Sequence, residues 1–159
     1  MDSKTIKLSE ILNGRRLTLS VAESCTGGLL GGAVTSAPGS SSYFRGGVIA
    51  YDNDIKRDIL GVPSEDLEKY GAVSDQVVRA MASGVAKLFG SDCAISVSGI
   101  AGPGGATEGK PVGLVFIGVS FKGKTQSRSF VFGGGREDVR AQSVSAAVEY
   151  LIEVLAGCP

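Results

Sequence analysis

Hydrophobic residues recur along this chain in two alternating patterns, one typical of amphipathic helices and the other of short buried strands. Behind Ser3, leucine and isoleucine residues follow roughly helical spacing, which predicts a helix over residues 3–13. Compact apolar runs at 17–22, 46–51 and 93–98 instead predict strands, because each is short and is bounded by glycine or polar residues.

The segments between and after these strands carry helical signals. Thr26 opens a run of small and apolar residues, and residues 53–60 form a shorter predicted helix that Gly61 ends. Ser74 is the predicted N-cap of a longer helix, and a last helix is predicted over residues 136–155. The apolar face of the helix after Ser74 consists of Val77, Val78, Met81, Val85 and Leu88.

A strand pair precedes the last helix. The apolar runs 113–121 and 126–132 flank a turn near residues 122–124, which predicts a β-hairpin. Alternating strands and helices followed by a hairpin predict an α/β fold, a three-layer α/β/α sandwich with a mixed, mostly parallel sheet. No repeat or linker interrupts the pattern, so we expect residues 1–159 to form one domain.

Charge and hydropathy narrow the choice of partner. The 16 basic and 16 acidic residues cancel without forming a basic block, which argues against nucleic acid as a partner. No apolar run reaches the ~20 residues that a membrane span needs, and the N-terminus lacks the apolar core of a signal peptide. We therefore expect a cytoplasmic protein that acts on a small molecule, and the sequence leaves open whether it forms a homodimer.

The chain has no histidine, and its three cysteines, Cys25, Cys93 and Cys158, are far apart. The absence of histidine excludes Ser-His-Asp and Cys-His machinery and His-ligated zinc. Without a CxxC pair, neither a disulfide nor a structural zinc is expected. Proton transfer must then use Lys, Tyr, Asp, Glu or Cys, and we expect no metal and no cofactor.

One glycine-rich segment imitates a phosphate-binding P-loop. Gly104 and the pair Gly109-Lys110 match the GxxxxGK spacing. However, Pro111 stands where the motif needs a serine or threonine for Mg²⁺, and a strand follows instead of a helix. We therefore reject a P-loop and interpret residues 99–105 as a glycine-rich loop that lines a site.

A small hydroxyl-rich turn follows the first strand. Glu23, Ser24, Cys25 and Thr26 precede the pair Gly27-Gly28. Backbone N–H groups at such a strand–turn–helix junction suit an anion or an oxyanion that develops during a reaction. A simpler interpretation is that Ser24 or Thr26 only caps the helix, with Glu23 either a solvated charge or an orienting partner.

A second polar cluster, from Tyr51 to Lys56, follows the next strand. If the two strands are parallel, their C-terminal ends share one edge of the sheet, and Ser24 and Tyr51 can meet there. In a chain without histidine, a lysine whose pKa is lowered by burial is the natural base for a serine nucleophile. Taken alone, Lys56 is more often a solvated surface residue and Tyr51 a core residue.

Glycines at 133–135 open the last predicted helix, with Arg136 and Arg140 one turn apart. Backbone N–H groups and guanidinium groups of this kind bind phosphate. An equally good interpretation is an ordinary helix start with salt-bridged surface arginines.

Ordered motifs run through nearly the whole chain. They are Glu23-Ser-Cys-Thr-Gly-Gly28, Pro38-Gly-Ser-Ser41, Gly46-Gly-Val-Ile-Ala-Tyr51, Asn53 with Lys56, Leu60-Gly-Val62, Gly71-Ala-Val-Ser74, Ser98-Gly-Ile-Ala-Gly-Pro-Gly-Gly105, Lys110-Pro-Val-Gly113 and Arg136-x-x-Val-Arg140. In this order they resemble the C-terminal domain of the competence/damage-inducible protein CinA, a family that includes stand-alone nicotinamide-nucleotide amidohydrolases. Two positions depart from the family pattern, since Gly135 replaces its usual Asp and Asp52 its usual Ser.

The resemblance implies an α/β/α fold and hydrolysis of nicotinamide mononucleotide to nicotinate mononucleotide and ammonia. It places the catalytic serine, tyrosine and lysine on Ser24, Tyr51 and Lys56. The substrate-binding residues that we expect are Cys25, Thr26, Gly27, Gly28, Gly99, Ala101, Gly102, Gly104, Gly105, Arg136 and Arg140.

The implied reaction is acyl transfer. Lys56 takes the Ser24 proton, and Ser24 attacks the carboxamide carbon. Backbone N–H groups near Cys25 to Gly27 stabilise the oxyanion, and Tyr51 orients Lys56 or relays a proton to ammonia. Three alternatives stay open, namely a nucleotide-binding module without catalysis, an amidase for another small amide, and Cys25 as the nucleophile.

Overall fold

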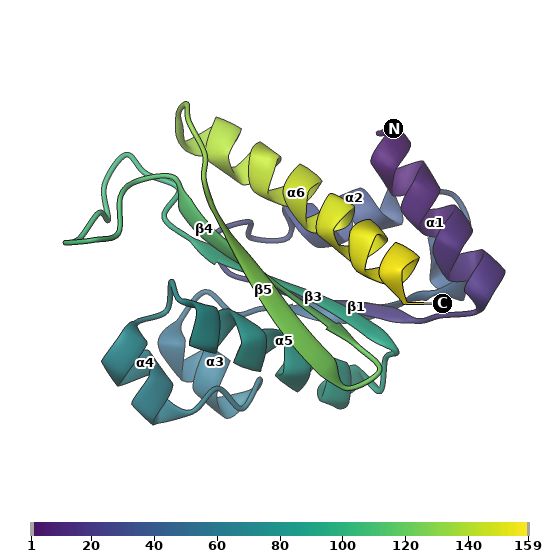
Figure 1. Ribbon diagram of the computed structural model, residues 1–159, viewed down its shortest axis with the longest axis horizontal. Coiled ribbons are helices and arrows are strands. Elements are labelled where there is room, and N and C mark those ends of the chain that lie inside the picture. Colours follow the sequence, from purple (N-terminus) through teal and green to yellow (C-terminus); the bar gives the residue numbers. More distant parts are fainter. Residues whose placement is uncertain (1, 159) are drawn as a thin grey trace.

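The computed structural model describes residues 2–158 and contains a five-stranded mixed sheet in the order β2-β1-β3-β4-β5 (Figure 1). β1 pairs in parallel with β2 and β3, whereas the β3–β4 and β4–β5 pairs are antiparallel. The strands are β1 (Leu19–Glu23), β2 (Phe44–Ile49), β3 (Cys93–Gly99), β4 (Leu114–Phe121) and β5 (Lys124–Val131). The predicted hairpin is confirmed, and the first two strands meet the condition of parallel pairing that the sequence left open.

Helices cover both faces of the sheet, which confirms the predicted three-layer arrangement (Figure 1). One face carries α1 (Ser3–Arg15), α2 (Leu29–Thr35) and α6 (Arg136–Gly157). The other carries α3 (Asn53–Asp58), α4 (Ser64–Tyr70) and α5 (Asp75–Phe89), and a short 3₁₀ turn lies at Ser40–Ser42. Within residues 2–158, no helix combines the length and apolar character needed to cross a bilayer.

α5 shows how the sequence pattern becomes a packed helix. The Ser74 hydroxyl accepts a hydrogen bond from the Val77 N–H at 3.3 Å, which caps the first turn as predicted. The predicted apolar face is buried against the sheet through Val85, but Leu88 is 53% exposed. The helix ends one residue later, before Gly90 in the left-handed conformation, so its last turn extends beyond the core.

The differences from the prediction include two helix starts and one additional helix. α1 is capped by the side chain of Asp2 and not by Ser3. α2 begins at Leu29, not near Thr26, because Gly27 and Gly28 adopt positive φ angles of 54° and 107°, which keep the chain in a turn. α4 was not predicted, and none of its residues is buried, so its sequence carries no apolar stripe.

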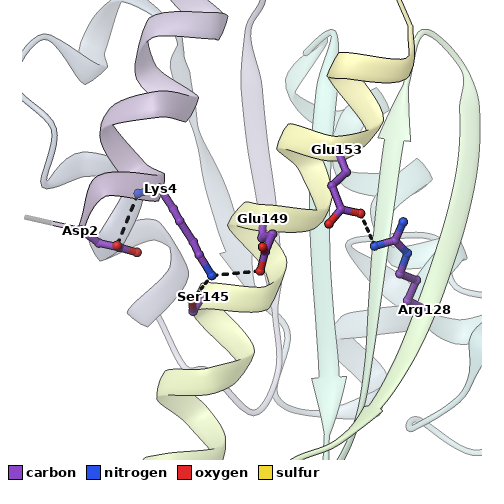
Figure 2. Close-up of polar contacts among 6 residues, drawn as sticks. All are labelled: Asp2, Lys4, Arg128, Ser145, Glu149 and Glu153. Atoms are coloured by element: carbon purple, nitrogen blue, oxygen red, sulfur yellow. Dashed lines mark hydrogen bonds and ion pairs between the residues drawn. The ribbon is translucent and has the colours of Figure 1, made fainter.

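α6 is held mainly by apolar contacts on its sheet-facing side. Val139, Ala147, Leu151 and Leu155 are buried in the cluster beneath it. Figure 2 shows two polar links on its outer side, from Lys4 of α1 to Ser145 and Glu149, and from Arg128 of β5 to Glu153. Because exposed ion pairs contribute only about 0–1 kcal/mol each, these links orient the helix more than they stabilise it.

Candidate active site

The C-terminal ends of the parallel strands bring two segments of the chain together. Glu23 at the end of β1 is aligned with Ile49 of β2, and the Ala50 N–H donates to the Glu23 carbonyl at 2.7 Å. On the other side of β1, the Ser24 N–H donates to the Val97 carbonyl of β3 at 2.9 Å. Ser24 and the Tyr51 segment therefore leave the sheet side by side, as ligand-binding residues of α/β folds commonly do.

Lys56 reaches from α3 to Ser24. Its Nζ atom lies 3.1 Å from Ser24 Oγ and donates to the Tyr51 carbonyl oxygen at 3.2 Å. Only 1% of Lys56 is exposed, so it is a buried residue and not the solvated lysine of the alternative interpretation. The short helix α3 starts where the Asp52 carboxylate caps the Asp54 N–H at 2.7 Å, which sets Lys56 one turn further along.

Burial also changes the acidity of this lysine. It lowers the pKa of Lys56 below the ordinary value of 10.5, because the charged ammonium loses its hydration, and the Asp52 carboxylate offsets part of that effect. Among residues 2–158, no carboxylate forms an ion pair with Lys56. A buried amine with a lowered pKa in contact with the Ser24 oxygen is the arrangement that a serine nucleophile needs from a general base.

Tyr51 contacts Lys56 through its backbone and not through its phenol. The side chain is 62% exposed, and its hydroxyl accepts a hydrogen bond from Arg136 Nη2 at 3.2 Å. The predicted role in orienting Lys56 is therefore filled by the Tyr51 carbonyl in this structure. The phenol lies instead at the mouth of the cavity beside Arg136.

Cys25 is the neighbour of Ser24 and the alternative nucleophile. Its side chain is buried, and burial raises the pKa of the thiol to about 11. Since the thiolate is the reactive form of cysteine, a thiol that stays protonated at neutral pH is poorly suited to attack an amide. The contact with Lys56 and this pKa both favour Ser24.

Glu23 holds the start of α2. Its carboxylate accepts hydrogen bonds from the N–H groups of Leu30 at 2.8 Å and Gly31 at 3.0 Å, and the residue is only 2% exposed. Of the two interpretations of Glu23, the structure supports an orienting partner. The N–H groups of Leu30 and Gly31 thus bind Glu23, that of Leu29 donates to the Thr26 carbonyl, and none of the three is free for a substrate.

The same turn limits which N–H groups can bind an oxyanion. The Gly27 N–H already donates to the Ser24 carbonyl at 3.1 Å. In the part of the chain that the structure describes, the N–H groups of Cys25 and Thr26 donate to no oxygen. The Gly28 N–H has no acceptor among the described residues either, but the N–H groups of Cys25 and Thr26 are nearer to Ser24 along the chain, so these two are the candidate donors to a negatively charged oxygen next to it.

Arg140 contacts the opposite side of this turn. From α6, its Nε donates to the Cys25 carbonyl at 3.0 Å and its Nη2 to the Thr26 carbonyl at 3.3 Å. Within residues 2–158 Arg140 forms no ion pair, so the structure does not support the salt-bridged surface arginine of the alternative interpretation. Its guanidinium binds these two carbonyls of the turn, and Arg140 does not line the cavity beside Ser24.

A cavity of about 270 Å³ opens in front of Ser24 and Lys56, close to the lower end of the range for small-molecule sites. It is lined by Ser24, Cys25, Tyr51, Asn53, Lys56, Ala72, Val73, Gly99, Ile100, Ala101, Gly102, Gly104, Gly105 and Arg136. Most of the predicted site residues are thereby brought together, whereas Thr26, Gly27, Gly28 and Arg140 lie outside this lining.

No aspartate or glutamate lines the cavity, and residues 2–158 contain no group of three or more His, Cys, Asp or Glu residues suited to a metal ion. A larger hollow of about 570 Å³ beside α5 is lined by Ser83 and Lys87 among others, but within residues 2–158 no hydrogen bond joins these two side chains.

The walls of the cavity are tied together by side chains that bind backbone carbonyls. Lys110 Nζ binds the Tyr70 carbonyl, and Ser98 Oγ donates to the Ala72 carbonyl at 2.8 Å. Arg136 Nη1 donates to the Gly102 carbonyl at 2.9 Å. Lys110, the lysine of the rejected P-loop match, is therefore an anchor for the wall formed by residues 70–73. Neither apolar residue of that wall, Ala72 or Val73, was predicted, because isolated small residues in a loop carry no chemical signal.

Curated relatives of this chain include two proteins named CinA-like. The one from Rippkaea orientalis is 52% identical over 147 residues, and the one from Thermotoga maritima is 48% identical over 147 residues. These matches cover 91% and 92% of this chain but only 35% and 36% of the relatives, so the chain spans about a third of their length.

Solved structures match over almost their full length. The competence damage-inducible protein A from Klebsiella pneumoniae superposes with a TM-score of 0.95 at 37% identity, covering 98% of this chain and 97% of that one. A competence/damage inducible protein from Agrobacterium tumefaciens gives a TM-score of 0.91 at 40% identity, covering 98% of both chains. The model of the CinA C-terminal domain matches residues 2–155. This chain belongs to the CinA C-terminal domain family.

Proposed function

We propose that this protein is an amidohydrolase that converts nicotinamide mononucleotide to nicotinate mononucleotide and ammonia. The observation that carries the proposal is the buried Lys56 amine 3.1 Å from Ser24 Oγ at the base of a cavity. Serine and lysine in contact form a nucleophile and its base, and that pair cleaves amides without histidine or a metal ion. The substrate follows from the resemblance to the nicotinamide-nucleotide amidohydrolases of this family.

The proposed reaction starts when neutral Lys56 takes the proton of Ser24 as Oγ attacks the carboxamide carbon. The N–H groups of Cys25 and Thr26 stabilise the negative oxygen of the tetrahedral intermediate. Lys56 then gives the proton to the departing nitrogen, and ammonia leaves an ester on Ser24. Water, deprotonated by the same lysine, hydrolyses that ester and regenerates the enzyme.

The charges of the cavity support an anionic substrate. Lys56 and Arg136 are its charged lining residues, and both are basic. Arg136 lies at the mouth, where its guanidinium already bonds Tyr51 and Gly102. A phosphate placed there is remote from the bond that breaks, as the phosphate of a nucleotide is remote from its carboxamide.

If Arg136 binds the phosphate, Arg136→Ala should raise KM for nicotinamide mononucleotide by about 10–100-fold and change kcat little, because the lost contact stabilises ground state and transition state alike. The measurement is steady-state kinetics on the nucleotide and on its dephosphorylated nucleoside, which serves as the matched control. If the variant discriminates between the nucleotide and the nucleoside as strongly as the wild type does, Arg136 has a purely structural role.

Arg140→Ala should have the opposite signature, a fall in kcat of about 10–100-fold with KM for the nucleotide within about threefold of wild type. The variant frees the carbonyls of Cys25 and Thr26, so the turn that carries the nucleophile moves, and small displacements of reacting groups are costly. Arg140→Lys keeps the positive charge but loses the two separate guanidinium N–H donors to the carbonyls of Cys25 and Thr26, so it should recover only part of the lost kcat. A raised KM with unchanged kcat would assign Arg140 to the phosphate after all.

Ammonia release is the direct test of the proposed function. Purified protein is assayed with nicotinamide mononucleotide, nicotinamide riboside, nicotinamide and pyrazinamide, with and without EDTA, and Ser24→Ala is the control for contaminating amidases. We expect fastest release from the nucleotide and no effect of EDTA. Binding of the nucleotide without turnover would identify a binding module, and preference for an unphosphorylated amide would identify an amidase of other specificity.

A further inference from the structure

Ser24 has a single basic neighbour in this site. In residues 2–158, Lys56 is the one amine or carboxylate within hydrogen-bond distance of Ser24 Oγ. No carboxylate lines the cavity, and burial keeps the Cys25 thiol protonated by raising its pKa to about 11. Lys56 must therefore assist both steps of the proposed reaction, the formation of the ester on Ser24 and the hydrolysis of that ester.

Attack on the ester depends on Lys56 to a degree that differs between water and an amine. Water is a weak nucleophile, so it must lose a proton to neutral Lys56 while it attacks the ester on Ser24. An uncharged amine attacks through its lone pair and releases a proton only after the C–N bond has started to form. An amine therefore needs less help from Lys56 than water does.

The cavity admits such an amine. It opens beside the exposed residues Tyr51 and Asn53, and its volume is about 270 Å³. The guanidinium of Arg136, which lines the cavity, repels cationic amines and leaves uncharged ones unaffected. The position that departing ammonia vacates is open to another nitrogen nucleophile of similar size.

We propose, building on the proposed amidase function, that this protein is also an acyltransferase toward small amines that are uncharged at neutral pH, such as hydroxylamine. The hydroxylamine nitrogen bonds to the acyl carbon, and the bond between that carbon and Ser24 Oγ breaks. The proton that nitrogen releases passes through Lys56 to Ser24 Oγ. The products are a hydroxamate and free enzyme, and the step consumes no oxidant or reductant.

The test measures how the acyl group is divided between water and hydroxylamine. Wild-type protein is incubated at pH 7 with nicotinamide mononucleotide and increasing hydroxylamine, and ammonia, nicotinate mononucleotide and hydroxamate are quantified. Hydroxamate should replace the acid, with a product ratio proportional to hydroxylamine concentration, while ammonia release continues. Ser24→Ala measures the uncatalysed reaction of hydroxylamine with the amide.

A second acyl donor identifies the intermediate. The N-methyl amide of the same nucleotide releases methylamine, but it should give the same hydroxamate-to-acid ratio, since both donors form one ester on Ser24. Normal ammonia release with acid as the only product, or a ratio that depends on the leaving amine, would overturn the inference and leave the amidase function standing. Absence of ammonia release from nicotinamide mononucleotide would refute the proposed function itself, and the transferase with it.

Discussion

Ser24→Ala is expected to lower kcat for amide hydrolysis by at least ~10³-fold, the scale of loss when a catalytic nucleophile is removed. Lys56 Nζ lies 3.1 Å from Ser24 Oγ, so the two side chains act as one unit. Lys56→Ala should therefore lose a similar factor, and the double variant should be no worse than either single variant. Steady-state ammonia release and circular dichroism of each variant are the measurements.

Cys25→Ala is the matched control, since it alters the neighbouring residue of the same turn. It should keep most of the activity, because the thiol is buried and its pKa is raised to about 11. Mass spectrometry of the quenched wild-type reaction shows which residue carries the acyl group. An adduct on Cys25, or an active Ser24→Ala protein beside an inactive Cys25→Ala protein, would overturn the assignment.

Lys56→Met is expected to remove the activity and at the same time to stabilise the fold. Methionine keeps the length and the apolar stem of the side chain, but it removes an amine that is buried without a carboxylate partner. Losing the hydrogen bond to the Tyr51 carbonyl costs about 1–3 kcal/mol, whereas burying an ion costs several. A net gain of about 1 kcal/mol would raise Tm by about 2–4 °C in a domain of this size.

The difference in stability between Lys56→Met and the wild type depends on pH with a definite sign. Burial lowers the pKa of Lys56 below 10.5, so between the folded-state pKa and 10.5 the unfolded chain binds more protons than the folded one, and wild-type stability rises with pH. The advantage of Lys56→Met is thus largest below the folded-state pKa and disappears near pH 10.5. Wild-type kcat should rise as the pH passes through the folded-state pKa, because Lys56 becomes neutral there, and should level off above it. Equal Tm differences at pH 7 and pH 10 would contradict a buried, titrating lysine.

The sheet and the Ser24–Lys56 pair could be predicted from the sequence because both depend on strong local signals. Apolar runs mark the strands, and the polar residues that follow β1 and β2 lie at the strand ends that parallel pairing brings together. The absence of histidine then left lysine as the base. The strands followed from local pattern alone, whereas the catalytic roles of Ser24 and Lys56 were assigned through the resemblance to the CinA family.

Other features of the site depend on contacts that no local pattern encodes. Arg140 looked like a phosphate ligand because it is a cation near a helix start, yet its partners are the carbonyls of Cys25 and Thr26. Tyr51 serves Lys56 through its backbone carbonyl, an atom that every residue type has. Glu23 caps α2 only because Gly27 and Gly28 delay the start of that helix, and such a delay cannot be read from composition.

The position of Arg140 also has a consequence for protein synthesis. Ser24 and Lys56 leave the ribosome before the guanidinium that holds the turn after Ser24, because that guanidinium belongs to α6, about 80 residues after Lys56 in the chain. Domains emerge N-terminal end first, at about 5–20 residues per second. The nascent chain therefore carries Ser24 and Lys56 for several seconds without the Arg140 contacts to the turn, and the proposed hydrolysis should begin only once α6 has docked.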